Sequence, residues 1–210
     1  MDNDFWLRLW DNNRIPFHEA AANSLLVKHL GALALPAASR IFLPLCGKSR
    51  DIAWLLSRGH RVVGAELSGL AIAQLFEELG AVPEITTSGA MPCFRAPGIA
   101  VHVGDIFDLT ATDLGPVDAV YDRAAVIALP ADLRQRYADH MAAITAIAPQ
   151  LLISFEHERK DRDGPPFTVD PAEITRLYGR NYDLSFLERI RVGRGPDGRS
   201  TTFDTIWLLR

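Results

Sequence analysis

Short aliphatic runs alternate with helically spaced apolar positions from residue 40 onward. Strands that alternate with helices in this way predict βαβ units and a mainly parallel sheet. Ser68 and Pro130 are expected at helix starts, and Gly59 at a helix end. The expected strands are 41–45, 61–67, 99–109, 117–123 and 150–156, and the expected helices are 51–59, 68–80 and 131–148.

The pattern changes after residue 156. A charged loop (156–170) leads to a short helix (171–179), and two strands follow near 184–192 and 202–209. The short GRGPDGR segment between these strands makes them antiparallel neighbours. The sequence therefore predicts an α/β fold with a doubly wound, mainly parallel, seven-stranded sheet that ends in an antiparallel hairpin. A connection at 83–98, rich in Pro, Gly, Ser and Thr, has room for a further hairpin.

The N-terminal FWLRLW places Phe5, Trp6, Leu9 and Trp10 on one helical face. So short a helix buries aromatic side chains only by docking on something. Packing against the core and contact with a ligand both remain open. We expect one domain over residues 1–210, with an N-terminal helical lid segment at 1–35 and an α/β core at 36–210.

Composition narrows the class of partner. The chain is 48% apolar, carries a formal net charge of −4 and contains only two cysteines, Cys46 and Cys93. This charge gives no electrostatic footprint for nucleic acid, and two cysteines do not make a disulfide framework. The acidic, aromatic N-terminus resembles neither a signal peptide nor a membrane span. We expect a cytoplasmic protein, a monomer, whose partners are small molecules rather than nucleic acid or membrane.

The stretch FLPLCGKSRD (42–51) raises the possibility of a phosphate-binding loop, because Lys48 and Ser49 follow Gly47. A Walker loop needs another glycine at the position of Phe42, which lies inside the predicted strand. The phosphate-loop interpretation therefore fails. Lys48 and Ser49 are expected as turn and N-cap residues, while Gly47 allows close approach of a ligand to the backbone.

Glu66 ends the second predicted strand. A carboxylate in this place commonly accepts two hydrogen bonds from a ribose diol, which favours an adenosine cofactor over a merely solvated side chain. This feature does not separate a nicotinamide dinucleotide from S-adenosylmethionine. The missing G-x-G-x-x-G weighs against the dinucleotide, and the C-terminal hairpin favours a methyltransferase.

Other polar residues carry weaker signals. Asp122 and Arg123 form either a structural ion pair or a site in which Arg123 recognises an electron-rich group. His18 either polarises a substrate or makes a hydrogen bond in the core. The rigid segment 165–167 presents Phe167 as a pocket edge.

A metal site is not expected. Glu156, His157 and Glu158 are consecutive in an extended segment, so their side chains face alternately opposite ways, and no cysteine supports them. Cys46 has no activating neighbour other than Lys48 and is expected to be a small buried hydrophobe.

Seven segments taken together resemble one known family. They are FWLRLWDNNRIPFHE, FLPLCGKSRDIAWL, GHRVVGAELS, DIFDL, YDRAAVIALP, RYADHM and GPPFTV, and they run through nearly the whole chain. In this order they are similar to the thiopurine S-methyltransferase family, of bacterial type, a branch of the class I S-adenosylmethionine-dependent methyltransferases with a Rossmann-like fold.

The resemblance implies a set of site residues. Trp10, with Trp6 nearby, matches the segment that closes over the cofactor, and Asp105 occupies a position where animal members carry Ser. Arg123 is implied as a contact of both the cofactor and the substrate. The implied cofactor residues are Trp6, Trp10, Leu45, Gly47, Glu66, Asp105, Ile106 and Arg123, and the substrate residues are Phe17, His18, Arg123 and Phe167.

The resemblance also implies the reaction. The methyl group of S-adenosylmethionine passes to the sulfur of a small aromatic or heterocyclic thiol, or to a selenium or tellurium compound, and S-adenosylhomocysteine is the product. We assign no catalytic acid or base, because the donor is already activated and a thiol is partly ionised near neutral pH. The alternatives are a class I methyltransferase with an oxygen, nitrogen or halide acceptor, a non-catalytic S-adenosylmethionine binder involved in metalloid resistance, and a nicotinamide oxidoreductase.

Overall fold

The computed structural model describes residues 3–15, 18–87, 89, 91–158, 164–194 and 200–210. The strands are Arg40–Pro44 (β1), Arg61–Glu66 (β2), Glu84–Thr87 (β3), Pro92–Ala96 (β4), Ile99–Val103 (β5), Ala119–Arg123 (β6), Gln150–His157 (β7), Leu184–Arg194 (β8) and Thr201–Leu209 (β9). The helices are Asn3–Asp11 (α1), Ser24–His29 (α2), Arg50–Ser57 (α3), Gly69–Glu78 (α4), Ala111–Leu114 (α5), Ala125–Ala128 (α6), Ala131–Ile144 (α7) and Pro171–Tyr178 (α8), with short 3₁₀ helices at Leu30–Leu33 (η1) and Ile106–Asp108 (η2).

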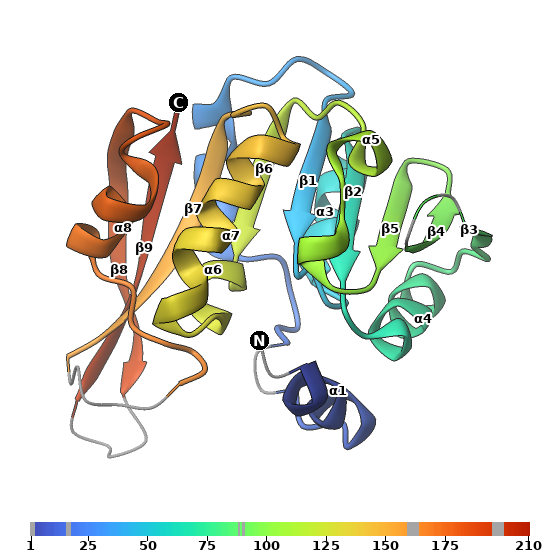
Figure 1. The fold of residues 1–210 in the computed structure, drawn as a ribbon, viewed down its shortest axis with the longest axis horizontal. Helices are drawn as coiled ribbons and strands as arrows, with labels where there is room; N and C mark the ends of the chain where they lie inside the picture. Colours follow the sequence, from blue (N-terminus) through green and yellow to red (C-terminus); the bar gives the residue numbers. More distant parts are fainter. Residues whose placement is uncertain (1–2, 16–17, 88, 90, 159–163, 195–199) are drawn as a thin grey trace.

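All strands join one sheet in the order β3-β4-β5-β2-β1-β6-β7-β9-β8 (Figure 1). The pairs among β5, β2, β1, β6 and β7 are parallel, and β9 lies antiparallel between β7 and β8. This confirms the mainly parallel sheet and its C-terminal hairpin. Over the described residues the sheet has nine strands rather than seven, because the connection at 83–98 forms the additional hairpin β3-β4 at one edge.

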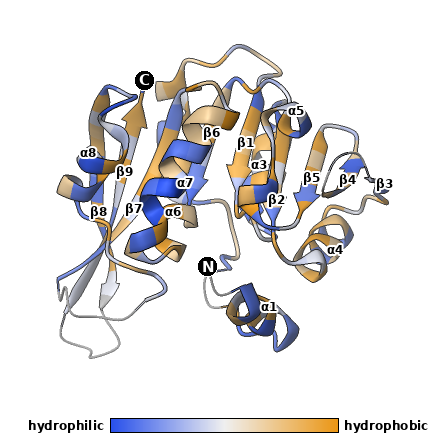
Figure 2. Cartoon of the chain, viewed as in Figure 1, coloured by the Kyte–Doolittle hydropathy of each residue, from blue (hydrophilic) through white to orange (hydrophobic). Residues whose placement is uncertain are grey.

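Two hydrophobic cores cover the two faces of the sheet. Strand residues alternate between them, so that Phe42 packs with α6, α7 and α8, while Ile41 and Leu43 pack with α2, α3 and α4. Figure 2 shows the hydrophobic residues gathered on the central strands and a hydrophilic outward face on α7. The period-two alternation thus produces the doubly wound arrangement. None of the described helices is both long and apolar enough to cross a membrane.

The N-terminal region divides into two parts. Leu25 and Leu26 in α2 and Leu33 in η1 are buried in the core under β1 and β6. Helix α1 instead lies apart from the layers, beside the carboxyl ends of the central strands (Figure 1). Within the expected lid segment 1–35, therefore, the part from residue 24 onward belongs to the core.

Two predicted elements end earlier than expected. The strand predicted at 99–109 stops at Val103, because Gly104 adopts a φ of +152° and Asp105 then caps the helix η2. The helix predicted at 131–148 stops at Ile144, since Ala146 and Ile147 both have positive φ. The turn expected between β8 and β9 falls largely on residues 195–199, which lie outside the described residues.

The predicted N-caps are confirmed. The Ser49 side chain accepts the N–H of Asp51 at the start of α3, and the Ser68 side chain accepts the N–H of Ala71 at the start of α4. Lys48 lies in the turn before α3 and pairs with Glu78 of α4 at 2.9 Å. These contacts fix where the two helices begin relative to β1 and β2.

Asp122 anchors α6 and α7 on one face of the sheet. Its Oδ1 accepts the N–H of Ala125 at 3.2 Å, and its Oδ2 accepts the hydroxyl of Tyr137 at 2.7 Å. Burial raises the pKa of Asp122 to about 6, although the Tyr137 hydroxyl and backbone N–H groups oppose that rise. The charged form of the buried Asp122 carboxyl is therefore stabilised by its hydrogen-bond donors.

Tyr137→Phe is expected to lower the free energy of unfolding by about 1.5–3 kcal/mol, because it leaves a buried carboxylate oxygen without its donor. Tyr178→Phe is the matched control, since the buried Tyr178 hydroxyl has no hydrogen-bond partner among the described residues. That change should be neutral within about 0.5 kcal/mol or stabilising. Urea unfolding of the two variants measures both values, and equal losses would contradict the role given to Asp122.

Candidate active site

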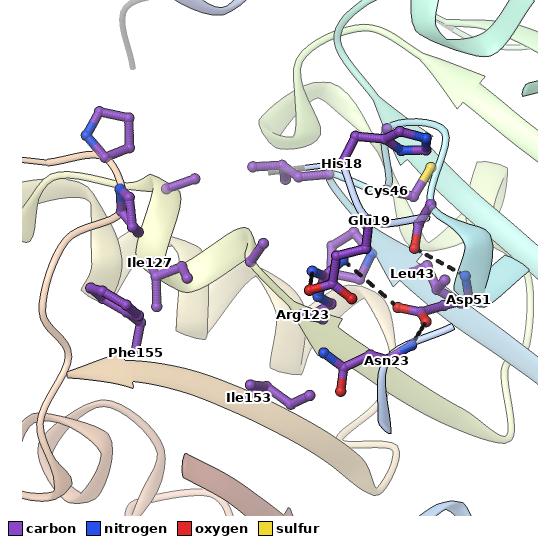
Figure 3. A pocket seen from close by; sticks show the side chains of 18 of the residues that line it. His18, Glu19, Asn23, Leu43, Cys46, Asp51, Arg123, Ile127, Ile153 and Phe155 are labelled. Atoms are coloured by element: carbon purple, nitrogen blue, oxygen red, sulfur yellow. Dashed lines mark hydrogen bonds and ion pairs between the residues drawn. The ribbon is translucent and has the colours of Figure 1, made fainter. Parts of the chain in front are cut away.

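A cavity of about 1000 Å³ opens at the carboxyl ends of β1, β2 and β6. This volume lies at the upper end of the range of small-molecule sites, roughly 300–1,000 Å³. Its walls come from α1, the segment after it, the turns that follow these strands, and the far part of the sheet. Figure 3 shows Arg123, Glu19 and Asp51 gathered on one side, with Ile127 and Phe155 facing them across the space. The cavity therefore has a polar side and an apolar side.

Glu66 holds one end of the cavity. One carboxylate oxygen accepts the N–H of Gly47 at 2.8 Å, and the other accepts the N–H of Ser68 at 2.9 Å. Glu66 is 7% exposed, so these bonds form in a largely water-free environment. One side chain thus joins the turn after β1 to the turn after β2. Each oxygen keeps a second lone pair that can accept a further hydrogen bond.

The turn after β1 approaches α1 closely. Gly47 has a φ of +50°, and a Cβ placed there would lie 3.1 Å from the Trp10 ring. A side chain at Gly47 would therefore be strained and would push Trp10 away. Trp10 is buried at 5% exposure, so its docking on this glycine fixes the helix over the site.

Strained backbone marks two of the turns that line the cavity. Leu45 follows β1 with a φ of +47°, and Ala124 follows β6 with a φ of +73°. Residues other than glycine rarely adopt this region, and where they do they cluster at functional sites. The two turns lie at the carboxyl ends of adjacent parallel strands, where doubly wound folds bind ligands.

Helix α1 is also tied to the sheet beyond β2. The Asn3 side chain donates to Asp105 Oδ2 at 3.1 Å, while Asp105 Oδ1 accepts the N–H of Phe107 at 3.0 Å. Ile106 lines a small hollow that shares Leu45 and Glu66 with the large cavity. The hollow therefore extends the Glu66 end toward β5.

Arg123 lies farther along the cavity, on β6, two strands away from β2. Its guanidinium pairs with Glu19 and lies 4.0 Å from Asp51. Asp51 in turn accepts the N–H of Asn23 at 2.7 Å and the hydroxyl of Tyr121 at 3.1 Å. Arg123 thus pairs with carboxylates from outside its own strand, while its neighbour Asp122 serves the other face of the sheet.

Burial shifts several ionisable groups in the cavity. It raises the pKa of Glu66, although N–H donors from Ser68, Gly47 and Leu67 oppose the rise. Burial raises the pKa of the Cys46 thiol well above its ordinary value, with Glu66 adding to the effect. The pKa of His18 is lowered, by burial first and then by Lys48, so its imidazole is neutral at pH 7. Cys46 and His18 are therefore uncharged groups.

Most of the residues expected from the sequence meet in this cavity. Ile106 lies in the adjoining hollow, and Asp105 lies beside it as a helix cap. Phe17 lies outside the described residues. The expected residues that line the cavity are Trp6, Trp10, His18, Leu45, Gly47, Glu66 and Arg123.

Phe167 is predicted to form an edge of the pocket, but it is not among the residues that line the cavity. Pro165 and Pro166 line the cavity, whereas the Phe167 ring lies 5.5 Å from the guanidinium carbon of Arg134, and its N–H donates to Ile127. The backbone bond to α6 turns the Phe167 ring toward α7. The prolines, rather than Phe167, form this edge.

Sequence reasoning missed four polar residues of the site. Glu19 and Asn23 carry no local signal, because their partners lie about a hundred and about thirty positions away along the chain. Asp51 reads as an ordinary acidic residue in the first turn of a helix. Asp204 had a detectable signal, since it is a charged residue in the apolar register of the last strand.

Comparison with known proteins places the chain in a family. The family model described as Thiopurine S-methyltransferase (TPMT) matches residues 1–202. The chain is 51% identical over 210 residues to a thiopurine S-methyltransferase of Xanthobacter autotrophicus, covering 100% of this chain and 99% of the relative. It is 43% identical over 203 residues to one of Gluconobacter oxydans, covering 97% and 92%.

A solved structure shares the fold. The 1,6-didemethyltoxoflavin-N1-methyltransferase of Burkholderia thailandensis, solved with 1,6-didemethyltoxoflavin and S-adenosylhomocysteine bound, superposes with a TM-score of 0.63 at 18% identity, over 99% of this chain and 86% of that one. This likeness confirms the class I methyltransferase fold. With the family match over nearly its whole length, the chain belongs to the thiopurine S-methyltransferase family and is an S-adenosylmethionine-dependent methyltransferase.

Proposed function

We propose that the enzyme transfers the methyl group of S-adenosylmethionine to the sulfur of a small aromatic or heterocyclic thiol. The observation that carries this proposal is one cavity with Glu66 at one end and Arg123 beside apolar walls at the other. Selenium and tellurium compounds are further candidate acceptors, since they are soft nucleophiles like sulfur.

The Glu66 end fits the adenosine part of the cofactor. The remaining lone pairs of Glu66 can accept both hydroxyls of a ribose, because two backbone N–H groups already orient the carboxylate. Gly47 and Leu45 would supply the backbone surface beside it, and the edge of the adenine would lie at the adjoining hollow lined by Ile106. The sulfonium of the bound cofactor supplies an activated methyl group.

Helix α1 would cover the bound cofactor as a lid. Trp10 docks on Gly47, and Asn3 binds Asp105, so the helix is held at both ends of the adenosine site. Trp6 lines the same cavity. Closing this side excludes water from the site. The lid would then end before α2, and the rest of the chain would form the α/β core.

The other end suits a flat, electron-rich acceptor. Ile127, Ile153 and Phe155 form apolar walls that can hold a ring. Arg123 lies opposite them, where its charge can stabilise a sulfur anion. The neutral His18 lines the same cavity, nearer to Cys46, and can add a polar contact. Holding acceptor and donor in line supplies the main rate enhancement, up to about 7–11 kcal/mol in favourable intramolecular models.

The acceptor atom can be tested with matched ring compounds. We expect methyl transfer from S-adenosylmethionine to benzenethiol, with little or none to phenol or aniline, because only the thiol ionises substantially near neutral pH. Mass spectrometry of the products identifies the methylated atom. Transfer to oxygen or nitrogen without transfer to sulfur would reject the thiol assignment.

Glu66→Ala should weaken S-adenosylhomocysteine binding by about 1.5–3 kcal/mol, the scale of hydrogen bonds to a charged group. Glu66→Gln keeps the shape, but its amide NH₂ must face the N–H of either Gly47 or Ser68 and cannot accept from the ribose, so it should lose a comparable amount. Isothermal titration calorimetry measures both affinities, and thermal unfolding checks the fold. An unchanged affinity in the alanine variant would remove the ribose role.

Arg123→Met should lower kcat/KM for a thiol by on the order of 10²-fold, as loss of one electrostatic stabiliser does elsewhere. Arg176→Met is the control, because Arg176 is an exposed arginine on α8 that does not line the cavity. The control should retain full activity. If Arg123→Met weakens S-adenosylhomocysteine binding and spares turnover at saturating cofactor, Arg123 belongs to the cofactor site instead.

A further inference from the structure

Asp204 is an exception in the pattern of β9. Residues Asp204, Ile206 and Leu208 point to the same face of the sheet, because side chains alternate along a strand. Ile206 and Leu208 are buried in the core on this face, packed with Ile153 and Leu151 of β7. The next position of this apolar row holds a carboxylate, which no core requires.

The row that contains Asp204 reaches the active-site cavity. Phe155 of β7 and Ile190 of β8 are its direct partners in the sheet, and all three residues line the cavity. Figure 3 shows Ile153 and Phe155, successive inward residues of β7, at the apolar side of that space. Asp204 is therefore a carboxylate set into the apolar wall that would hold the acceptor.

The Asp204 carboxylate makes no polar contact that would stabilise the fold of the described residues. Within the described part of the chain it makes no hydrogen bond or ion pair, in contrast to Glu66, Asp51 and Asp122. Burial between apolar neighbours raises its pKa to about 6, Arg123 opposes the rise, and Glu19 adds to it. Such a group is mostly ionised at pH 7 and still takes a proton readily.

The reaction produces a proton that needs an acceptor. The sulfur of a thiol forms its bond to the methyl carbon as the carbon–sulfur bond of the sulfonium breaks, and the electron pair of that bond goes to the leaving sulfur. The proton on the acceptor, carried by sulfur or by a ring nitrogen of the thione tautomer, must also leave.

Other groups around the cavity are poorer proton acceptors. Arg123 is always protonated and cannot take one. Glu19 is already paired with Arg123, and its side chain is 45% exposed. His18 lies over Cys46 near the cofactor end (Figure 3). Arg14 lines the cavity and is also a permanent cation.

We propose that Asp204 takes the proton from the acceptor as its sulfur is methylated, while Arg123 stabilises the sulfur. This inference rests on the proposed thiol methylation. It assigns the reaction a general base that the family resemblance did not imply. It also favours neutral acceptors that carry a proton over acceptors that are already anionic, because an anionic acceptor has no proton for Asp204 to take and would be repelled by its carboxylate.

The test compares Asp204→Asn with the wild type on substituted benzenethiols whose pKa values run from below to above the assay pH. Asp204→Asn should lower kcat on the order of 10²-fold for the least acidic thiols and little for those already ionised. In the wild type, kcat/KM for a weakly acidic thiol should fall about tenfold per pH unit below about pH 6. In Asp204→Asn the break in the profile should move from about pH 6 to the pKa of the thiol itself, because only the thiolate is then methylated.

Two further variants make the assignment specific. His18→Gln should keep the acidic limb of the pH profile, and Asp139→Asn, an exposed acid on α7, should keep full activity. Thermal unfolding of Asp204→Asn should be no lower than that of the wild type, since a half-buried charge that is unpaired among the described residues is removed. S-adenosylhomocysteine affinity should also be unchanged.

The possible outcomes are distinct. A uniform loss across all thiols, an unchanged pH profile in Asp204→Asn, or loss of the limb in His18→Gln instead would overturn the assignment of Asp204 while leaving thiol methylation in place. A wild-type enzyme that methylates none of the thiols would reject the proposed function itself, and the role of Asp204 with it.

Discussion

The site depends on one buried carboxylate, that of Glu66. It accepts N–H groups from Gly47 and Ser68 and so fixes two turns that leave adjacent parallel strands. A buried charge is costly unless it is fully hydrogen-bonded, and these donors provide that compensation. The turn at Gly47 then offers a flat surface on which Trp10 docks. The position of α1 and the shape of this end of the cavity therefore both follow from the same side chain.

The Arg123 part of the cavity depends on the alternation of side chains along β6. Asp122 and Arg123 are neighbours in β6, so their side chains face opposite sides of the sheet. Asp122 binds Tyr137 in one core, whereas Arg123 pairs with Glu19 beside the cavity. One dipeptide thus contributes a structural anchor to one layer and a cation to the site. This separation explains why these opposite charges need not pair with each other.

The sequence was most informative where the signal is local. Alternating strands, the N-caps Ser49 and Ser68, and the acid at the end of β2 were all readable, because each depends on spacing and on residue type. The strand predicted through 109 ended at Val103 because Gly104 takes an unusual backbone angle, which apolar content does not reveal.

Long-range contacts were not readable. The pairing of Glu19 with Arg123 and the turning of Phe167 toward Arg134 depend on which elements meet in three dimensions. The hairpin β3-β4 could be anticipated only as a possibility, since its strands are only 4 and 5 residues long. Asp204 could be predicted in part. The sequence shows a charged residue among the apolar positions of the last strand, but it does not show that Phe155 of β7 and Ile190 of β8 lie beside it.

A crystal structure of the enzyme with S-adenosylhomocysteine tests the central claim most directly. The account predicts both ribose hydroxyls on the Glu66 carboxylate, the Trp10 ring still on Gly47, and the homocysteine sulfur facing the space between Arg123 and the apolar wall. A ribose bound away from Glu66, or a sulfur that points out of this cavity, would contradict the account.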